Sequence, residues 1–180
     1  VVPALQENGH EVFVLDNLSF GSRAFIEVDD EHFILADLRD REAVQKTVKE
    51  LAPEWIVHLA AIHFIPYCNA HPVEASQVNL GGTLNLLAAA EQVPGLERFF
   101  FASTAAVYPI MDEAIPETTS PGPMDIYGLT KQVGEHLCRE FHLKTQVPTI
   151  LCRFFNAFGP NETNPHLIPE IQQQLLAGER

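Results

Sequence analysis

Positively charged side chains are scarce in this chain of 180 residues. It contains 11 lysines and arginines against 24 aspartates and glutamates, and its formal net charge at pH 7 is −13. An excess of negative charge repels phosphate backbones and anionic lipid headgroups, so we expect neither nucleic acid nor a membrane surface as a partner. A small nucleotide ligand remains compatible with this charge, because local dipoles and single cations determine its binding.

Cysteine is also rare. Cys68, Cys138 and Cys152 are odd in number and widely spaced, and they match neither a disulfide framework nor a paired metal motif. His63 and His71 lack the compact spacing of a zinc site, so we expect no metal. The sequence therefore indicates buried or partly buried free thiols in a reducing cytoplasm.

Long apolar runs, internal repeats and low-complexity segments are missing as well. No run approaches the length that spans a membrane, and no charged-then-apolar leader precedes the first predicted element. The length suffices for one sizeable core, or for one domain and part of another.

Short apolar segments alternate with helical patterns along the chain. Strands are expected at Glu11–Leu15, His32–Ala36, Trp55–Ala60, Arg98–Ala102 and Thr149–Phe154, and helices at 1–8, Arg41–Leu51, Pro72–Gln92, Asp125–His142 and Pro169–Ala177. This alternation predicts right-handed βαβ units and a parallel sheet with helices on both faces. The third strand is almost continuously apolar, which predicts burial on both faces. We expect Trp55 in the core and His58 as a hydrogen-bonded core histidine.

The carboxyl ends of the predicted strands carry small or polar residues. These are Asp16, Asp37, Ala60–Ala61, Ser103–Thr104 and Phe155–Asn156. Ligands of parallel α/β sheets bind beyond this edge, so the sequence predicts that these positions converge on a ligand site.

Two of these positions have alternative interpretations. Asp16 could accept the hydroxyls of an adenosine ribose and repel a 2′-phosphate, which favours NAD over NADP, or it could only begin a loop. Arg23 is the nearest cation that would reverse this preference. Ser103 and Thr104 could hydrogen-bond a substrate oxygen, or they could only open a loop.

Tyr127 and Lys131 stand four residues apart in a predicted helix, so their side chains lie on one face. A unit charge about 4 Å away, at an effective dielectric constant near 20, stabilises a phenolate by roughly 4 kcal/mol. That would bring the tyrosine pKa from about 10 towards about 7, where the phenolate can accept a proton from a sugar hydroxyl.

Together these segments resemble the extended short-chain dehydrogenase/reductase family, in particular its NAD-dependent nucleotide-sugar epimerases and dehydratases. The resemblance rests on segments in the family's order: Gly9-His-Glu-Val, Asp16-Asn-Leu-Ser, Asp37-Leu, His58-Leu-Ala-Ala, Asn79-Leu-Gly-Gly-Thr83, Ser103-Thr-Ala-Ala-Val-Tyr108, Tyr127-Gly-Leu-Thr-Lys131 and Arg153-Phe-Phe-Asn156 with Gly159-Pro160. It implies a Rossmann-like, doubly wound α/β fold and NAD as the cofactor.

The resemblance also implies residue roles. Thr104, Tyr127 and Lys131 would be catalytic. The cofactor would be bound by Asp16, Asn17, Asp37, Leu38, Leu59, Ala60, Ala61, Asn79, Tyr127, Lys131 and Phe155. The substrate would be bound by Thr104, Asn156 and His166. His166 stands where many relatives have asparagine, which leaves the base and the sugar open.

The implied activity is epimerisation of a nucleotide-diphosphate sugar through a transient keto-sugar. Ala105 and Ala106 occupy the positions where 4,6-dehydratases carry an Asp-Glu pair, and alanine transfers no proton, so ordinary dehydration is disfavoured. A dehydratase or a reductase of the same family is the alternative enzyme. A non-catalytic NAD-sensing or scaffold protein is the alternative of another class.

We expect an NAD-binding domain over 1–155 and the start of a substrate-binding region over 156–180. The family's first strand and glycine-rich phosphate turn are expected before Val1, and most of the sugar-closing segment after Arg180. The 180 residues alone are therefore expected to be a fragment that binds NAD poorly and turns over little. An intact, cytoplasmic homodimer is expected, joined through Pro72–Gln92 and Asp125–His142.

Overall fold

The chain divides into two compact units in the computed structural model, which describes residues 1–157, 159, 164 and 166–178. Unit 1 consists of Val1–Ile34 together with Asn156–Arg180, and unit 2 is Leu35–Phe155. The assignment of an NAD-binding domain to 1–155 and a substrate-binding region to 156–180 stays a prediction.

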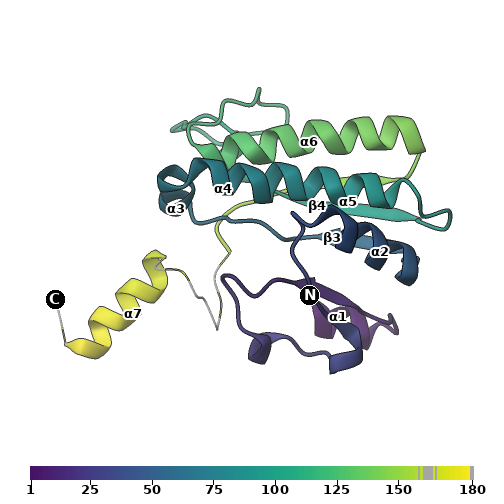
Figure 1. Ribbon diagram of the computed structural model, residues 1–180. Helices are drawn as coiled ribbons and strands as arrows, with labels where there is room; N and C mark the ends of the chain where they lie inside the picture. The colour runs from purple at the N-terminus through teal and green to yellow at the C-terminus, as the bar shows by residue number, and fades with distance from the viewer. Residues whose placement is uncertain (158, 160–163, 165, 179–180) are drawn as a thin grey trace. The chain divides into compact units, whose positions relative to one another are not determined.

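Unit 1 contains two short strands and several helical segments (Figure 1). Its elements are α1 (Val2–Glu7), β1 (Val14–Asp16), the 3-10 turns η1 (Arg23–Phe25) and η2 (Asp30–His32), β2 (Phe33–Leu35), whose last residue belongs to unit 2, and α7 (Leu167–Ala177). Strands β1 and β2 are paired. Gly9 follows α1 with φ of +85°, a conformation that glycine adopts without strain, and it ends this helix as predicted.

Unit 2 is built around a parallel three-stranded sheet of order β3-β4-β5. Its elements are α2 (Arg41–Leu51), β3 (Trp55–His58), α3 (Ile65–Ala70), α4 (Pro72–Ser76), the π-helical segment η3 (Gln77–Gly82), α5 (Thr83–Ala90), β4 (Arg98–Thr104), the 3-10 turn η4 (Ala105–Val107), α6 (Ile126–Thr145) and β5 (Thr149–Phe154). Trp55 pairs with Arg98, and Thr104 pairs with Phe154. The predicted α/β class with parallel strands is therefore confirmed.

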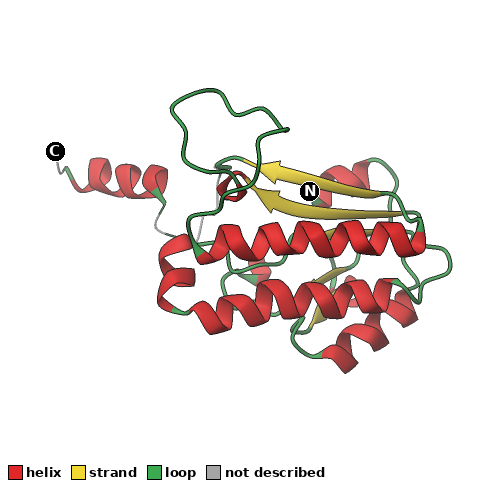
Figure 2. Cartoon of the chain, turned by 90° about the horizontal axis from the view of Figure 1, so that it is seen from above, coloured by secondary structure: helices red, strands yellow, loops and turns green. Residues whose placement is uncertain are grey.

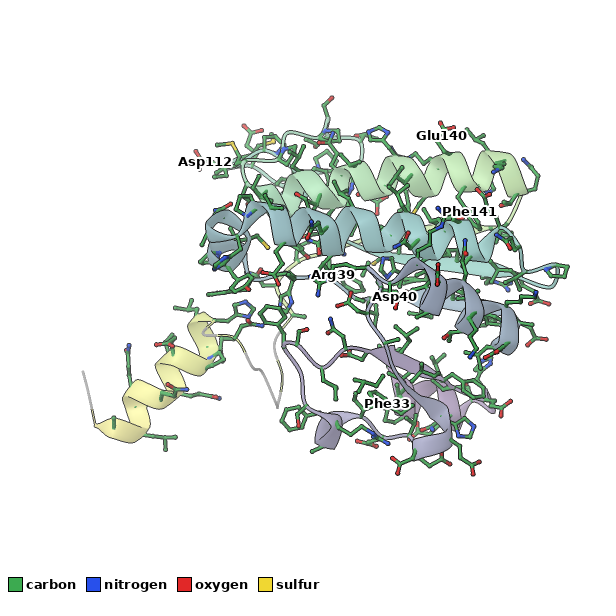
Figure 3. The ribbon with its side chains drawn as sticks, viewed as in Figure 1. Phe33, Arg39, Asp40, Asp112, Glu140 and Phe141 are labelled. Carbon is green, nitrogen blue, oxygen red and sulfur yellow. The ribbon has the colours of Figure 1, made fainter. Side chains whose placement is uncertain are left out.

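Alternate residues of β4 form the core of unit 2. Phe99 and Phe101 are fully buried against the helices, which lie over one face of the sheet, with α6 beside the α4–α5 row (Figure 2). Phe141 of α6 packs on Phe99 with ring centroids 5.5 Å apart, whereas the neighbouring Glu140 lies on the exposed side of the helix (Figure 3). Aromatic packing thus holds α6, the helix that carries Tyr127, against the sheet.

Two expectations about the third strand are wrong. Trp55 is 42% exposed, and Val57 is also exposed. Side chains alternate along a strand, and the helices of unit 2 cover the face to which His58 points, so Trp55 and Val57 point away from them. As predicted, His58 is a buried, hydrogen-bonded histidine, with its Nε2 atom 2.9 Å from Thr83 Oγ1.

The predicted helix Pro72–Gln92 is also more complex than expected. It consists of α4, the π-helical segment η3 and α5, while α3 was not predicted at all. By contrast, α2 and β5 have the predicted limits. Among the residues that the structure describes, no helix combines the length and apolarity needed to cross a membrane.

Candidate functional site

The N-terminal turn of α6 presents Tyr127 at the carboxyl end of β4. Asp125 caps the helix, because its Oδ1 atom accepts a hydrogen bond of 2.7 Å from the backbone N–H of Gly128. Lys131 follows Tyr127 by one turn and is 3% exposed. Its Nζ atom lies 4.8 Å from the ring centroid of Phe101 and 6.0 Å from that of Tyr127.

Thr104 is the last residue of β4 and faces this turn. It is 8% exposed, and its Oγ1 atom accepts a hydrogen bond from the backbone N–H of Ala106 at 3.2 Å. The hydroxyl of Thr104 also lies close enough to the phenol of Tyr127 to lower its pKa as a hydrogen-bonding group. The structure therefore brings together the three predicted catalytic side chains, Thr104, Tyr127 and Lys131.

Gly128 allows this close approach of α6 to η4. A Cβ atom on Gly128 would lie 2.2 Å from the carbonyl oxygen of Ala106 and 2.9 Å from its carbonyl carbon. Backbone atoms cannot rotate out of the way as a flexible side chain can. Glycine is therefore required at this point for Tyr127 to reach Thr104.

The electrostatics of Tyr127 differ from the sequence-based expectation. Burial raises the pKa of Tyr127 above its ordinary value, and the hydrogen bond from Thr104 acts in the opposite direction. Burial also lowers the pKa of Lys131 to about 8. The expected lowering of the tyrosine pKa by Lys131 is thus contradicted, because both groups are covered by protein and the ammonium lies over Phe101.

A buried polar cluster that the sequence did not reveal lies next to the predicted catalytic residues. Glu135, one turn after Lys131, is 1% exposed and accepts hydrogen bonds from Ser103 Oγ at 2.6 Å and from Arg153 Nε at 2.7 Å. The hydroxyl of Ser103 therefore donates its hydrogen bond to Glu135 within the protein. The spacing of Glu135 on the face of Lys131 was the available signal for this cluster.

Asn79 forms a second buried anchor. Its carboxamide accepts a hydrogen bond from the Ile62 backbone N–H at 2.9 Å, and donates to the Ile62 carbonyl at 3.0 Å and to Thr130 Oγ1 at 3.1 Å. It lies in η3, and π-helical segments frequently occur at functional sites. Asn79 thus ties the segment after β3 to the residue that precedes Lys131.

The predicted cofactor-lining residues of unit 2 have contrasting environments. Leu59, Ala60 and Phe155 are exposed at the carboxyl ends of their strands, and Ala61 is partly buried. Leu38 is buried, and its carbonyl accepts a hydrogen bond from Asn85. The carboxylate of Asp37 is paired with Arg39, with Nη2 at 2.6 Å from Oδ2. The parallel register places the ends of β3, β4 and β5 at one edge of the sheet, as predicted.

The remaining predicted residues belong to unit 1. Asp16 Oδ1 accepts a hydrogen bond of 2.6 Å from the backbone N–H of Leu18, and Asn17 Oδ1 accepts one from Ser19. Asn156 is exposed, and the N–H of His166, the residue before α7, donates to the carbonyl of Asn164 at 2.8 Å. The roles of Asp16, Asn17, Asn156 and His166 stay predictions.

The hydrogen-bond partners of Arg23 within the chain bear on the choice between NAD and NADP. Its guanidinium donates to the carbonyls of Ile26 and Val28, both at 2.7 Å, and lies over the ring of Phe33. These contacts hold it within its own loop.

The three cysteines are free, as predicted; Cys68 and Cys138 are buried and Cys152 is partly buried. In the ranges 1–157, 159, 164 and 166–178 we find no group of three or more His, Cys, Asp or Glu side chains arranged to hold a metal ion.

Comparison with known proteins places this geometry in a family. The model of the NAD-dependent epimerase/dehydratase family matches residues 1–180. The UDP-glucose 4-epimerase of Bacillus subtilis is 33% identical over 187 residues, which cover 94% of this chain and 55% of that protein. A dTDP-glucose 4,6-dehydratase of Xanthomonas campestris is 30% identical over 186 residues, covering 95% of this chain and 53% of that protein.

A solved structure gives the same answer. The UDP-glucose 4-epimerase of Thermus thermophilus in complex with NAD superposes with a TM-score of 0.89 at 33% identity, covering 99% of this chain and 58% of the other. The Rossmann-like fold is thereby confirmed. The chain spans about half the length of the curated relatives it matches. On these matches, the chain belongs to the NAD-dependent epimerase/dehydratase family.

Proposed function

We propose that the full-length protein epimerises a nucleotide-diphosphate sugar in an NAD-dependent reaction that passes through a transient keto-sugar. This proposal rests on one observation, which is that Thr104, Tyr127 and Lys131 lie close together at the carboxyl end of β4. A hydroxyl, a phenol and an ammonium in one covered site can move a proton to and from a sugar hydroxyl.

The residues present fit NAD. Leu59 and Phe155 offer exposed apolar surface at the strand ends, and Ala60 beside Leu59 is small and exposed. The carboxylate of Asp16 suits the ribose hydroxyls, and Arg23 is held by its own loop, which favours NAD over its 2′-phosphorylated form. Tyr127 and Lys131 would face the nicotinamide ribose.

Each catalytic side chain has a defined task in this proposal. Tyr127, as the phenolate, accepts the proton of the sugar hydroxyl and later returns it. Thr104 donates a hydrogen bond to the phenolate oxygen, which favours the charged form that burial disfavours. Lys131 adds a positive charge near the ring of Tyr127. NAD, when bound, supplies the acceptor and donor of the sugar's hydride, and its positively charged oxidised ring further favours the phenolate.

Epimerisation is favoured over dehydration by the residues that follow Thr104. Ala105 and Ala106 belong to η4 and carry no group that could protonate a leaving hydroxyl. The Xanthomonas relative is a dehydratase, so a dehydratase is the second candidate. Product analysis separates the two, because epimerisation conserves the mass of the sugar whereas dehydration removes one water.

The test is turnover of UDP-glucose and related nucleotide sugars by the full-length protein and by its Tyr127→Phe variant. The test needs the full-length protein, because the alignment that covers 94% of this chain covers 55% of the B. subtilis relative, and we propose that the 180 residues turn over little alone. We expect an epimer without net formation of NADH, and loss of turnover with retained NAD binding in the variant. A net change in NADH would indicate a relative that releases its product, with NADH formed by a dehydrogenase and consumed by a reductase. If the wild-type protein binds NAD but turns over no nucleotide sugar, it would be a sensor or a scaffold.

We also propose that the intact protein is a homodimer. Leu84 of α5 and Leu129 of α6 are about half exposed, and Leu143 of α6 is 65% exposed. The helices α5 and α6 lie side by side (Figure 2). The exposed leucines therefore add apolar surface to this helical layer. Leu84→Glu should shift the protein to a monomer in light scattering. Leu176→Glu, at an 89% exposed position of α7, is the control and should leave the mass unchanged.

We place the protein in the cytoplasm, and the three free cysteines support this assignment.

A further inference from the structure

Glu135 lies at the centre of a hydrogen-bonded cluster that joins three elements of unit 2. It stands on α6, one turn beyond Lys131, and is almost completely buried. Its Oε1 atom accepts from Ser103 Oγ of β4 at 2.6 Å. Arg153 of β5 donates to both carboxylate oxygens, from Nε to Oε1 and from Nη2 to Oε2, each at 2.7 Å.

Arg153 extends the cluster towards η4. The side chain is 16% exposed, and its guanidinium lies 4.6 Å from the ring centroid of Tyr108, the residue that follows η4. Its Nη1 atom also donates to the carbonyl of Glu117 at 3.5 Å. One guanidinium therefore contacts α6 and both ends of the segment between η4 and Glu117.

The cluster is adjacent in sequence to the catalytic residues on both sides. Ser103 immediately precedes Thr104 on β4, and Glu135 follows Lys131 by one turn on α6. A shift of α6 along the sheet would break the paired hydrogen bonds between Glu135 and Arg153, because two parallel N–H···O bonds fix both distance and angle.

The pair keeps its charges. Burial works against a charged Glu135, but hydrogen bonds from Arg153 and Ser103 hold its pKa below the ordinary value. The hydrogen bond to Glu135 raises the pKa of Arg153. Neither group changes its charge near neutral pH, so a pH effect of altering the pair has to arise at another group.

We propose that Glu135 and Arg153 are positioning residues, which fix α6 against β4 and β5 and thereby hold the Tyr127 phenol at the Thr104 hydroxyl. This inference rests on the function proposed above. The pair itself does not touch the reacting atoms.

Arg153→Lys in the full-length protein tests this inference, with Arg139→Lys as the matched control. Both variants keep the charge of an arginine that contacts Glu135, but Arg139 is 50% exposed and makes one contact of 3.3 Å. Lysine cannot form the two parallel bonds. We expect Arg153→Lys to lower kcat for UDP-glucose about 10- to 100-fold, with a nearly unchanged KM. Arg139→Lys should leave both parameters unchanged.

The pH profile separates positioning from simple stabilisation. The hydrogen bond from Thr104 lowers the pKa of Tyr127, so a weaker bond raises this pKa and moves the acid limb of kcat to higher pH. The other titratable groups near Tyr127, which are Cys68, Asp125 and Lys131, are the same in both variants. Arg153→Lys should move the limb and Arg139→Lys should not. A lower melting temperature with an unchanged limb and an unchanged kcat would overturn the proposal.

A second variant and a second readout keep the test independent of folding and of turnover. Ser103→Ala removes one hydrogen bond from Glu135 and should move the acid limb in the same direction by a smaller amount. If the wild-type protein turns over no nucleotide sugar, the proposed function fails. The ultraviolet titration of Tyr127, measured as the difference from Tyr127→Phe, would still show whether Arg153→Lys raises its pKa. An unchanged titration in the folded Arg153→Lys and Ser103→Ala variants would overturn the positioning role.

Discussion

Gly128→Ala is the substitution whose effect the structure determines most closely. The added Cβ atom would lie 2.2 Å from the carbonyl oxygen of Ala106, and the two nearest atoms that it meets belong to the backbone. An unstrained contact of this kind is longer than about 3 Å, so α6 and η4 have to separate by roughly 1 Å. Overpacking of this kind typically costs about 1–3 kcal/mol. The better helix propensity of alanine offsets up to about 1 kcal/mol of this cost.

The expected net loss is therefore about 1–2 kcal/mol, which corresponds to a fall in melting temperature of roughly 2–8 °C for a domain of this size. Turnover should suffer more than stability, because a displacement of about 1 Å at a catalytic group can reduce the rate about 100-fold. The separation moves Tyr127 away from Thr104, since Gly128 is the next residue of the same turn.

The assay compares Gly128→Ala with Gly81→Ala in thermal unfolding and in turnover. A Cβ atom on Gly81 meets no other atom within 4 Å, so this control should unfold at the wild-type temperature or above it and keep its turnover. If Gly128→Ala unfolds at the wild-type temperature and retains wild-type kcat, the argument for a required close approach at this position is refuted.

Three further predictions concern buried polar groups. Asn79→Ala removes three hydrogen bonds and leaves buried groups of Ile62 and Thr130 unpaired, so it should lower the free energy of unfolding in urea by about 2–4 kcal/mol. The control Asn85→Ala should lower it by about 1 kcal/mol or less. Equal losses in the two variants would contradict the anchoring role of Asn79. Burial lowers the pKa of Lys131 from 10.5 to about 8, so the unfolded state binds more protons between these values and stability should rise with pH across this window by roughly 3 kcal/mol. The stability of Lys131→Met relative to the wild type should therefore fall across the same window, and a constant difference would show that Lys131 is not perturbed. Gly134→Ala places a Cβ atom 2.5 Å from Cζ of Phe101, which is a side-chain atom. This variant should therefore lose less stability than Gly128→Ala. A larger loss would contradict the distinction between backbone and side-chain obstruction.

Local sequence patterns predicted where helices and strands lie better than they predicted which side chains are buried. The helical pattern of Arg41–Leu51 predicted the limits of α2, and the apolar run Thr149–Phe154 predicted those of β5. Burial was predicted less well, because an apolar strand does not show which of its faces a helix will cover. Trp55 and Val57 were expected to be buried on these grounds and are exposed.

The candidate site shows the same division. The spacing of Tyr127 and Lys131 predicted that they share a helix face, and the position of Thr104 after a strand predicted its place at the sheet edge. The direction of the Tyr127 pKa was predicted wrongly, since burial of both groups cannot be read from spacing. The cluster of Ser103, Glu135 and Arg153 was missed for a related reason, because it joins residues far apart in sequence that only the packing of α6 on the sheet brings together.

The most direct test of the central claim is a single reaction, in which the full-length protein and NAD are incubated with UDP-glucose while the sugar is followed by NMR and NADH by absorbance. Our account predicts that the 4-epimer of the sugar appears without net NADH, and that Tyr127→Phe abolishes its formation. Formation of the epimer at an undiminished rate by Tyr127→Phe, or a product that has lost water, would contradict the assignment of Thr104, Tyr127 and Lys131 as an epimerase site.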